Sequence, residues 1–106
     1  MSTTPDFIEY VCEQISGVGN VRHRKMFGEY MVYVNDKPVL LVCDNTVFVK
    51  ILPCTEKLME DASKGFPYKG AKEHYILDTD NALLAKDIAR VLEKNTPLPK
   101  RKKKNV

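Results

Sequence analysis

The fold of this chain is decided by the stretch Val39-Leu40-Leu41-Val42-Cys43-Asp44-Asn45-Thr46-Val47-Phe48-Val49-Lys50-Ile51. Its first five residues form a continuous apolar run, which is typical of a strand covered on both faces. Asp44 and Asn45 tolerate turn conformations and predict a tight turn. Residues 47–51 then place alternate side chains on opposite sides, as a strand does. Because short turns join antiparallel strands, the stretch predicts part of a meander.

Further strands are predicted on both sides of this stretch. Upstream, residues 22–27 form a candidate strand that leads to Gly28. Residues 30–34 are aromatic and β-branched, and a turn at residues 35–37 separates them from the apolar run. Downstream, Pro53 ends the strand-rich part of the chain, and residues 74–77 form one more candidate strand. Residues 66–70 between them are expected to form a loop.

Three helices are predicted from apolar spacing and helix signals. Thr4 and Pro5 favour a helix start, Gly17 and Gly19 a stop, so the first helix is placed at residues 5–16. A short second helix precedes Gly65, and a last helix is capped within residues 78–80 and ends at Asn95. The apolar faces consist of Phe7, Ile8, Val11, Cys12 and Ile15; of Cys54, Leu58, Met59 and Ala62; and of Leu84, Ala85, Ile88, Val91 and Leu92.

The predicted order is α-β-β-β(-β)-α-β-α, an α+β class fold with a central antiparallel sheet and helices packed on one face. Regular strand–helix alternation, which an α/β fold requires, is missing from the middle of the chain. With helices for one face only, we expect a homodimer in which a second subunit covers the other face.

Length and charge predict one domain with a basic tail. The 106 residues suffice for a single core, so residues 1–96 are assigned to one domain. Net charge is +3, but without one basic run the chain has 12 basic and 14 acidic residues. Residues 97–106 are therefore expected to be a disordered basic tail that contacts nucleic acid weakly and without sequence preference. The candidate contact residues are Lys100, Arg101, Lys102, Lys103 and Lys104.

Catalytic and cofactor chemistry is not predicted. Cys12, Cys43 and Cys54 form no C-x-x-C pair, so neither a zinc site nor a disulfide framework is expected. Two of these cysteines lie on apolar helix faces and one ends an apolar strand, as small buried hydrophobes do. We expect no enzyme activity, no metal and no cofactor. The chain shows no secretory signal or membrane span, so a cytoplasmic location is expected.

The segment around residues 21–34 and two later segments contain residues typical of one protein family. These residues are Arg24, Met26, Phe27, Gly28, Tyr30 and Tyr33, followed by Asp44, residues 47–50 and Phe66-Pro67-Tyr68. With them the chain resembles the N-terminal domain of the TfoX/Sxy family. Glu29 and Met31 stand where the family usually has glycine. The resemblance extends over about residues 5–95. It implies a two-layer α+β fold and a role in regulating transcription or competence, and it carries over no catalytic residue.

Three functions remain open from the sequence. The first is a non-catalytic regulatory module that binds a partner protein, with the transcription machinery as a candidate. Its candidate surface consists of Arg22, Arg24, Met26, Phe27, Gly28, Tyr30 and Tyr33, since arginine and tyrosine are favoured at binding hot spots. The plainer interpretation of that segment is a strand–turn–strand with core aromatics and solvated cations. The second function is a nucleic-acid accessory protein acting through its tail, and the third is a small ligand-binding or enzymatic domain.

Overall fold

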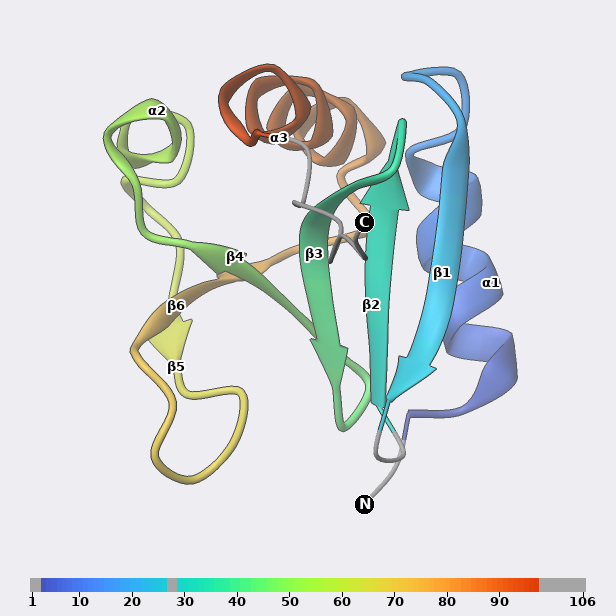
Figure 1. The fold of residues 1–106 in the computed structure, drawn as a ribbon. Coiled ribbons are helices and arrows are strands. Elements are labelled where there is room, and N and C mark those ends of the chain that lie inside the picture. The colour runs from blue at the N-terminus through green and yellow to red at the C-terminus, as the bar shows by residue number, and fades with distance from the viewer. Residues whose placement is uncertain (1–2, 27–28, 98–106) are drawn as a thin grey trace, which may run out of the picture.

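The computed structural model describes residues 3–26 and 29–97 and confirms the predicted α+β class (Figure 1). Its strands form one antiparallel sheet in the order β1-β2-β3-β4-β6-β5. In chain order the elements are α1 (Pro5–Gln14), β1 (Val21–Met26), β2 (Glu29–Val34), β3 (Lys37–Cys43), β4 (Thr46–Lys50), α2 (Pro53–Glu56), β5 (Lys64–Gly65), β6 (His74–Leu77) and α3 (Ala82–Asn95).

Two tight turns set the register of the meander as the sequence predicts. Asn35 and Asp36 join β2 to β3, and Asp44 and Asn45 join β3 to β4. All four residues have positive φ, between 52° and 68°. Asparagine and aspartate tolerate this left-handed region better than other non-glycine residues, and such turns suit the twist of paired strands. The short turns therefore fix β2, β3 and β4 as consecutive neighbours.

The helix boundaries partly follow the sequence signals. The Thr4 side chain accepts a hydrogen bond from the Phe7 N–H at 3.2 Å, which confirms the predicted start of α1. Three boundaries differ from the prediction. Helix α1 ends at Gln14 and not at residue 16. Helix α3 is capped by Asn81, one residue beyond the predicted 78–80. Helix α2 ends at Glu56, and the chain continues in turns through Asp61, so Leu58 is exposed while Met59 is buried.

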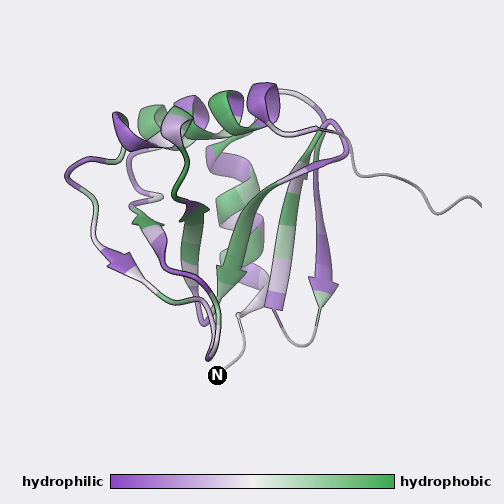
Figure 2. Cartoon of the chain, turned by 60° about the vertical axis from the view of Figure 1, so that its left-hand side comes forward, coloured by the Kyte–Doolittle hydropathy of each residue, from purple (hydrophilic) through white to green (hydrophobic). Residues whose placement is uncertain are grey.

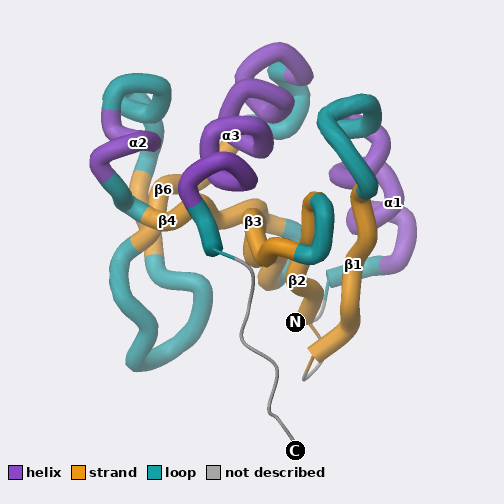
Figure 3. Tube along the Cα trace, turned by 45° about the horizontal axis from the view of Figure 1, so that its top comes forward, coloured by secondary structure: helices purple, strands orange, loops and turns teal. Residues whose placement is uncertain are grey.

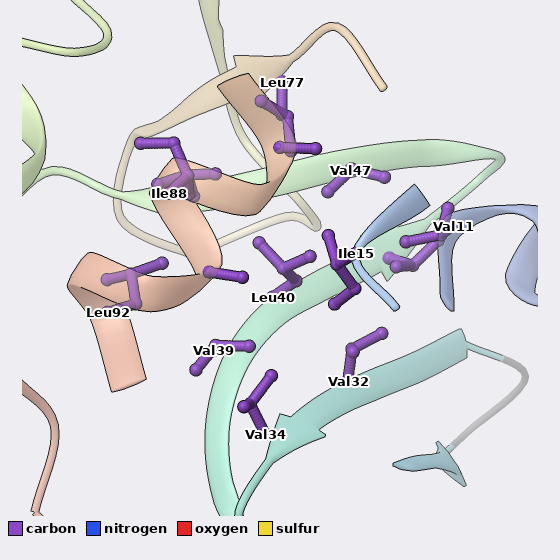
Figure 4. Packing of buried hydrophobic residues seen from close by; sticks show 14 of the residues in the cluster. Val11, Ile15, Val32, Val34, Val39, Leu40, Val47, Leu77, Ile88 and Leu92 are labelled. Carbon is purple, nitrogen blue, oxygen red and sulfur yellow. The ribbon is translucent and has the colours of Figure 1, made fainter. Parts of the chain in front are cut away.

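The core lies between the sheet and the helices (Figure 4). Apolar and polar segments alternate along α1 and α3, as expected for helices with one buried side (Figure 2). Ile88 and Leu92 of α3 and Ile15 of α1 are at most 1% exposed. They pack in one cluster with side chains of the sheet: Tyr30, Val32, Val34, Val39, Leu40, Val42, Val47, Val49, Tyr75 and Leu77.

The strand registers divide the sheet into two faces. On β2, Tyr30, Val32 and Val34 are buried and face the helices. Met31 and Tyr33 alternate with them and so lie on the opposite face, which we call the open face. The helices of the described chain form one layer and the sheet the other (Figure 3). The homodimer expectation stays a prediction.

Candidate interaction surface

The open face has an apolar centre formed by the middle strands. Met31 of β2 is directly opposite Leu41 of β3, and Leu41 is opposite Phe48 of β4. Phe48 in turn is opposite Ile76 of β6. Residues directly opposite in neighbouring strands share a face, so these four side chains form a continuous apolar row across the sheet. We call this row the apolar row.

A cavity of about 620 Å³ lies at one end of the apolar row. The sheet forms one wall, and Pro67 and Tyr68 of the loop between β5 and β6 contribute the other. Its lining residues are Met26, Glu29, Tyr30, Met31, Leu41, Cys43, Pro67 and Tyr68. The cavity has the size of a small-molecule pocket, and its largely apolar wall carries a single charged group.

That charged group, Glu29, is held by neighbouring residues. Its Oε1 atom accepts hydrogen bonds from the Thr3 hydroxyl at 2.8 Å and from the Asp44 N–H at 3.0 Å. The Thr3 hydroxyl also accepts a hydrogen bond from the Asn45 N–H at 3.2 Å. Glu29 therefore ties the N-terminal segment to the β3–β4 turn. This gives a structural use to a position where the resembling family usually has glycine.

Cations border the apolar row on the β1 side. The Arg22 guanidinium pairs with Asp36 at 2.9 Å and lies 5.5 Å from the centre of the Tyr33 ring. Arg24 is opposite Met31, and its side chain is exposed. Neither Arg24 nor Lys25 forms an ion pair with any residue of the described ranges. Arg24 is thus solvated and available to a partner on the open face, whereas Lys25, opposite Tyr30, is exposed on the helix-facing side of the edge strand.

The sequence-predicted surface residues separate into two groups. Arg22, Arg24, Met26 and Tyr33 lie on the open face. Tyr30 lies on the helix-facing side, 8% exposed, where its ring meets His23 edge-on at 5.4 Å. The plainer interpretation thus holds for Tyr30, which is a core aromatic. Phe27 and Gly28 lie outside the described residues, as do Lys100, Arg101, Lys102, Lys103 and Lys104.

The members of this surface that come from β3 and from the β5–β6 loop were not predicted from the sequence. Leu41 and Cys43 were assigned only to a strand covered on both faces, and Pro67 and Tyr68 to a loop. The available signal was the alternation along β2, which places Met31 and Tyr33 on one side. Extended across the tight turn in a regular register, however, that alternation pairs Met31 with Leu40. The register shift between Val32 and Tyr33, which the sequence does not indicate, is what places Leu41 opposite Met31.

The cysteine environments differ from those of nucleophiles. Cys43 is 3% exposed, and burial together with the nearby Glu29 and Asp44 carboxylates raises its pKa to about 11. Burial also raises the pKa of Cys12, with a smaller contribution from Glu9. Thiolate is the reactive form, so both thiols are neutral at pH 7. In the ranges 3–26 and 29–97 no three potential metal ligands of the His, Cys, Asp or Glu type cluster.

We expect Cys43 to react very slowly with iodoacetamide. At pH 8 a thiol with a pKa of about 11 has about one-hundredth of the thiolate of a thiol with the ordinary pKa of 9.0. Peptide mapping after alkylation should therefore find Cys43 modified last. In the unfolded chain the Cys43 thiol ionises at a lower pH than in the folded protein. Its ionisation should therefore reduce the free energy of unfolding as the pH rises from about 9 to about 11. Cys43→Ala, the control, should lose this contribution; rapid modification of Cys43 in the folded protein would contradict the assignment.

None of the described helices is long and apolar enough to cross a bilayer.

Comparison with known proteins places the chain in a family. Residues 13–94 match the model of the TfoX N-terminal domain. The chain belongs to the TfoX N-terminal domain family. In this TfoX N-terminal domain the matched segment contains the whole sheet. It also contains every described residue of the cavity wall.

A curated relative has similar size. It comes from Spirochaeta aurantia and is named "Uncharacterized 12.7 kDa protein in trpE 5′ region". The two proteins are 33% identical over 105 residues, which is 97% of this chain and 91% of the relative. The similarity therefore extends over nearly the full length of both proteins.

Proposed function

We propose that this TfoX N-terminal domain is a non-catalytic regulatory module that binds a partner protein through the open face of its sheet. The observation that carries the proposal is the apolar row, which has no helix over it among the described residues. The row is bordered by Arg24, which forms no ion pair with any described residue. An apolar centre with a polar rim is the usual anatomy of a protein interface. Family membership favours regulation, and a component of the transcription machinery is the candidate partner.

The same surface supports enzyme chemistry poorly. A nucleophile requires an adjacent base and a third group that orients the base. Cys43 at the cavity wall is a neutral thiol, and the Glu29 carboxylate accepts its hydrogen bonds from Thr3 and Asp44. The cavity therefore offers shape and apolar contact, which suit an apolar side chain of a partner better than a reacting substrate.

Affinity capture from nuclease-treated native lysate tests the proposal. Immobilised domain should retain a partner protein when nucleic acid has been removed, and should lose it when the apolar row carries a charge. The control is an equal charge on the helix layer, at the exposed Leu83. Capture that disappears with nuclease treatment alone would show that nucleic acid, not protein, is what the domain binds.

The second candidate function is nucleic-acid binding through the tail, and the five consecutive cations at residues 100–104 favour it. We expect deletion of residues 97–106 to abolish DNA affinity while leaving the melting curve nearly unchanged. Five cations limit the slope of log affinity against log salt to about 4, because each neutralised phosphate contributes roughly 0.7–0.9. Salt-titrated binding of the full-length and shortened proteins measures both effects. Retained DNA binding with an unchanged slope would instead place the nucleic-acid site on the cations of β1.

A further inference from the structure

Strand β1 is a long sheet edge with unpaired backbone groups. The sheet ends on one side with β5, which has two residues, and on the other with β1, which has six. The Asn35 N–H donates to the Asn20 carbonyl at 2.9 Å, just beyond the Val21↔Val34 pair. Antiparallel pairing alternates from there, so the backbones of Arg22 and Arg24 bond to β2. Those of Val21, His23 and Lys25 point away from the sheet.

These outward groups have no partner in the described parts of the chain. No hydrogen bond joins the Val21, His23 or Lys25 backbone to residues other than those of the sheet. Helix α1 lies behind β1 rather than beside it in the plane of the sheet (Figures 1 and 2). An edge of this kind is a template for a further strand.

The side chains of β1 select the strand that can be added. Arg22, His23, Arg24 and Lys25 are consecutive and all exposed, so the edge is cationic on both faces of the sheet. A second copy of β1 would place like charges opposite one another, which is destabilising. Cationic edges thus oppose self-pairing, and they complement aspartate and glutamate on an incoming strand.

We propose that β1 binds an extended acidic segment of the partner protein as an additional strand of the sheet. Backbone N–H and C=O groups of the segment pair with those of Val21, His23 and Lys25, and its carboxylates face Arg24 and its neighbours. On the open face, the added strand lies next to Arg22, Arg24 and Met26, which adjoin the apolar row. The inference rests on the proposed function, because it names the chemistry by which the partner is recognised.

A nucleic acid fits this edge less well than a peptide. It offers no alternating donors and acceptors that match a strand edge, and sequence-tolerant binding of single strands relies on exposed aromatic platforms. On the open face the Tyr33 ring lies under Arg22, and Phe48 is 7% exposed. The exposed rings, Phe66 and Tyr68, belong to the segment between β5 and β6 and not to β1. The edge formed by β1 therefore offers backbone groups and cations but no exposed phenylalanine or tyrosine ring.

Two fluorescein-labelled, end-blocked peptides test the proposal, one with four Val-Glu repeats and one with four Val-Lys repeats. We expect the Val-Glu peptide to bind about tenfold more tightly than the Val-Lys peptide. In two cross-strand residue pairs it places a carboxylate opposite a cation of β1, where Val-Lys places a like charge. In amide NMR spectra, saturation with Val-Glu should slow the exchange of the Val21, His23 and Lys25 N–H groups. The amides of Arg22 and Arg24, already bonded to β2, should change less.

Two matched pairs of variants separate charge from backbone pairing. His23→Pro removes one outward N–H at a position where an edge strand tolerates proline, and His23→Ala keeps that N–H. We expect the proline variant to bind Val-Glu about tenfold more weakly than the alanine variant, since strand addition relies on main-chain bonds. Arg24→Glu should weaken binding severalfold, and Lys57→Glu on the helix layer should leave it unchanged.

Each of the following would overturn the addition of an acidic strand: equal affinity for both peptides, equal binding by His23→Pro and His23→Ala, or preferential protection of these amides by single-stranded oligothymidine. A concentration-dependent dimer in light scattering that competes with Val-Glu would overturn it in favour of a second copy. These failures differ from failure of the proposed function. Partner capture that is sensitive to the apolar row but indifferent to Arg24→Glu and His23→Pro would keep the protein-binding role and reject the acidic strand.

Discussion

Ile88→Asp is expected to leave the domain largely unfolded at room temperature. Ile88 is fully buried on α3, where it packs in the core cluster with Leu77 of β6 and Leu40 of β3. The substitution buries a carboxylate that has no partner, and it removes the packing of the isoleucine. The cost is several kcal/mol, comparable with the roughly 5–15 kcal/mol by which a domain is stable.

A thermal melt followed by circular dichroism measures this effect. The matched control is Leu83→Asp, which makes a similar change on the same helix at a side chain that is 78% exposed. We expect the control to melt close to the unsubstituted protein. An unchanged melt for Ile88→Asp would mean that α3 is not docked on the sheet.

Met31→Asp is expected to abolish partner binding while the domain stays folded. Met31 is only half-buried, at the centre of the apolar row and in the wall of the cavity. A carboxylate there can remain hydrated in the free protein, but it must be desolvated when a partner covers the apolar row. Substitution of a central interface residue costs about 2 kcal/mol or more, a loss of at least about thirtyfold in affinity.

The affinity capture described above, made quantitative with purified partner, measures the loss. Leu83→Asp again serves as the control, because it adds the same charge to the helix layer. Both variants should give melting curves close to that of the unsubstituted protein. If folded Met31→Asp bound the partner with undiminished affinity, the apolar row would not be the binding surface.

The elements predicted correctly from the sequence are those set by local chemistry. The Thr4-Pro5 start of α1 and the turns at Asn35-Asp36 and Asp44-Asn45 follow from the conformations that these residues favour. The start of α3 was misplaced because several residues in a row could cap it. In the structure Asp80 hydrogen-bonds to the Tyr10 hydroxyl and Asp78 accepts from the Asp80 N–H, which leaves Asn81 as the cap.

Features that depend on distant contacts were not predictable in the same way. Strand β5 has two residues, and its pairing with β6 brings Gly65 close to Ile76 and Phe48. A shift of register between Val32 and Tyr33 lets both Val39 and Leu40 be buried, so the apolar run does not alternate in burial. The cavity required the β5–β6 loop to fold over the sheet, and nothing in the spacing of Pro67 and Tyr68 indicates this position.

Site-specific photo-crosslinking tests most directly whether the open face is the partner-binding surface. Tyr33 on the open face and Leu83 on the helix layer can each be replaced by p-benzoylphenylalanine, one variant at a time. After irradiation in nuclease-treated native lysate, the Tyr33 position should yield a covalent adduct with the captured partner and the Leu83 position should not. Adducts from Leu83 with none from Tyr33 would place the partner on the helices and contradict the account.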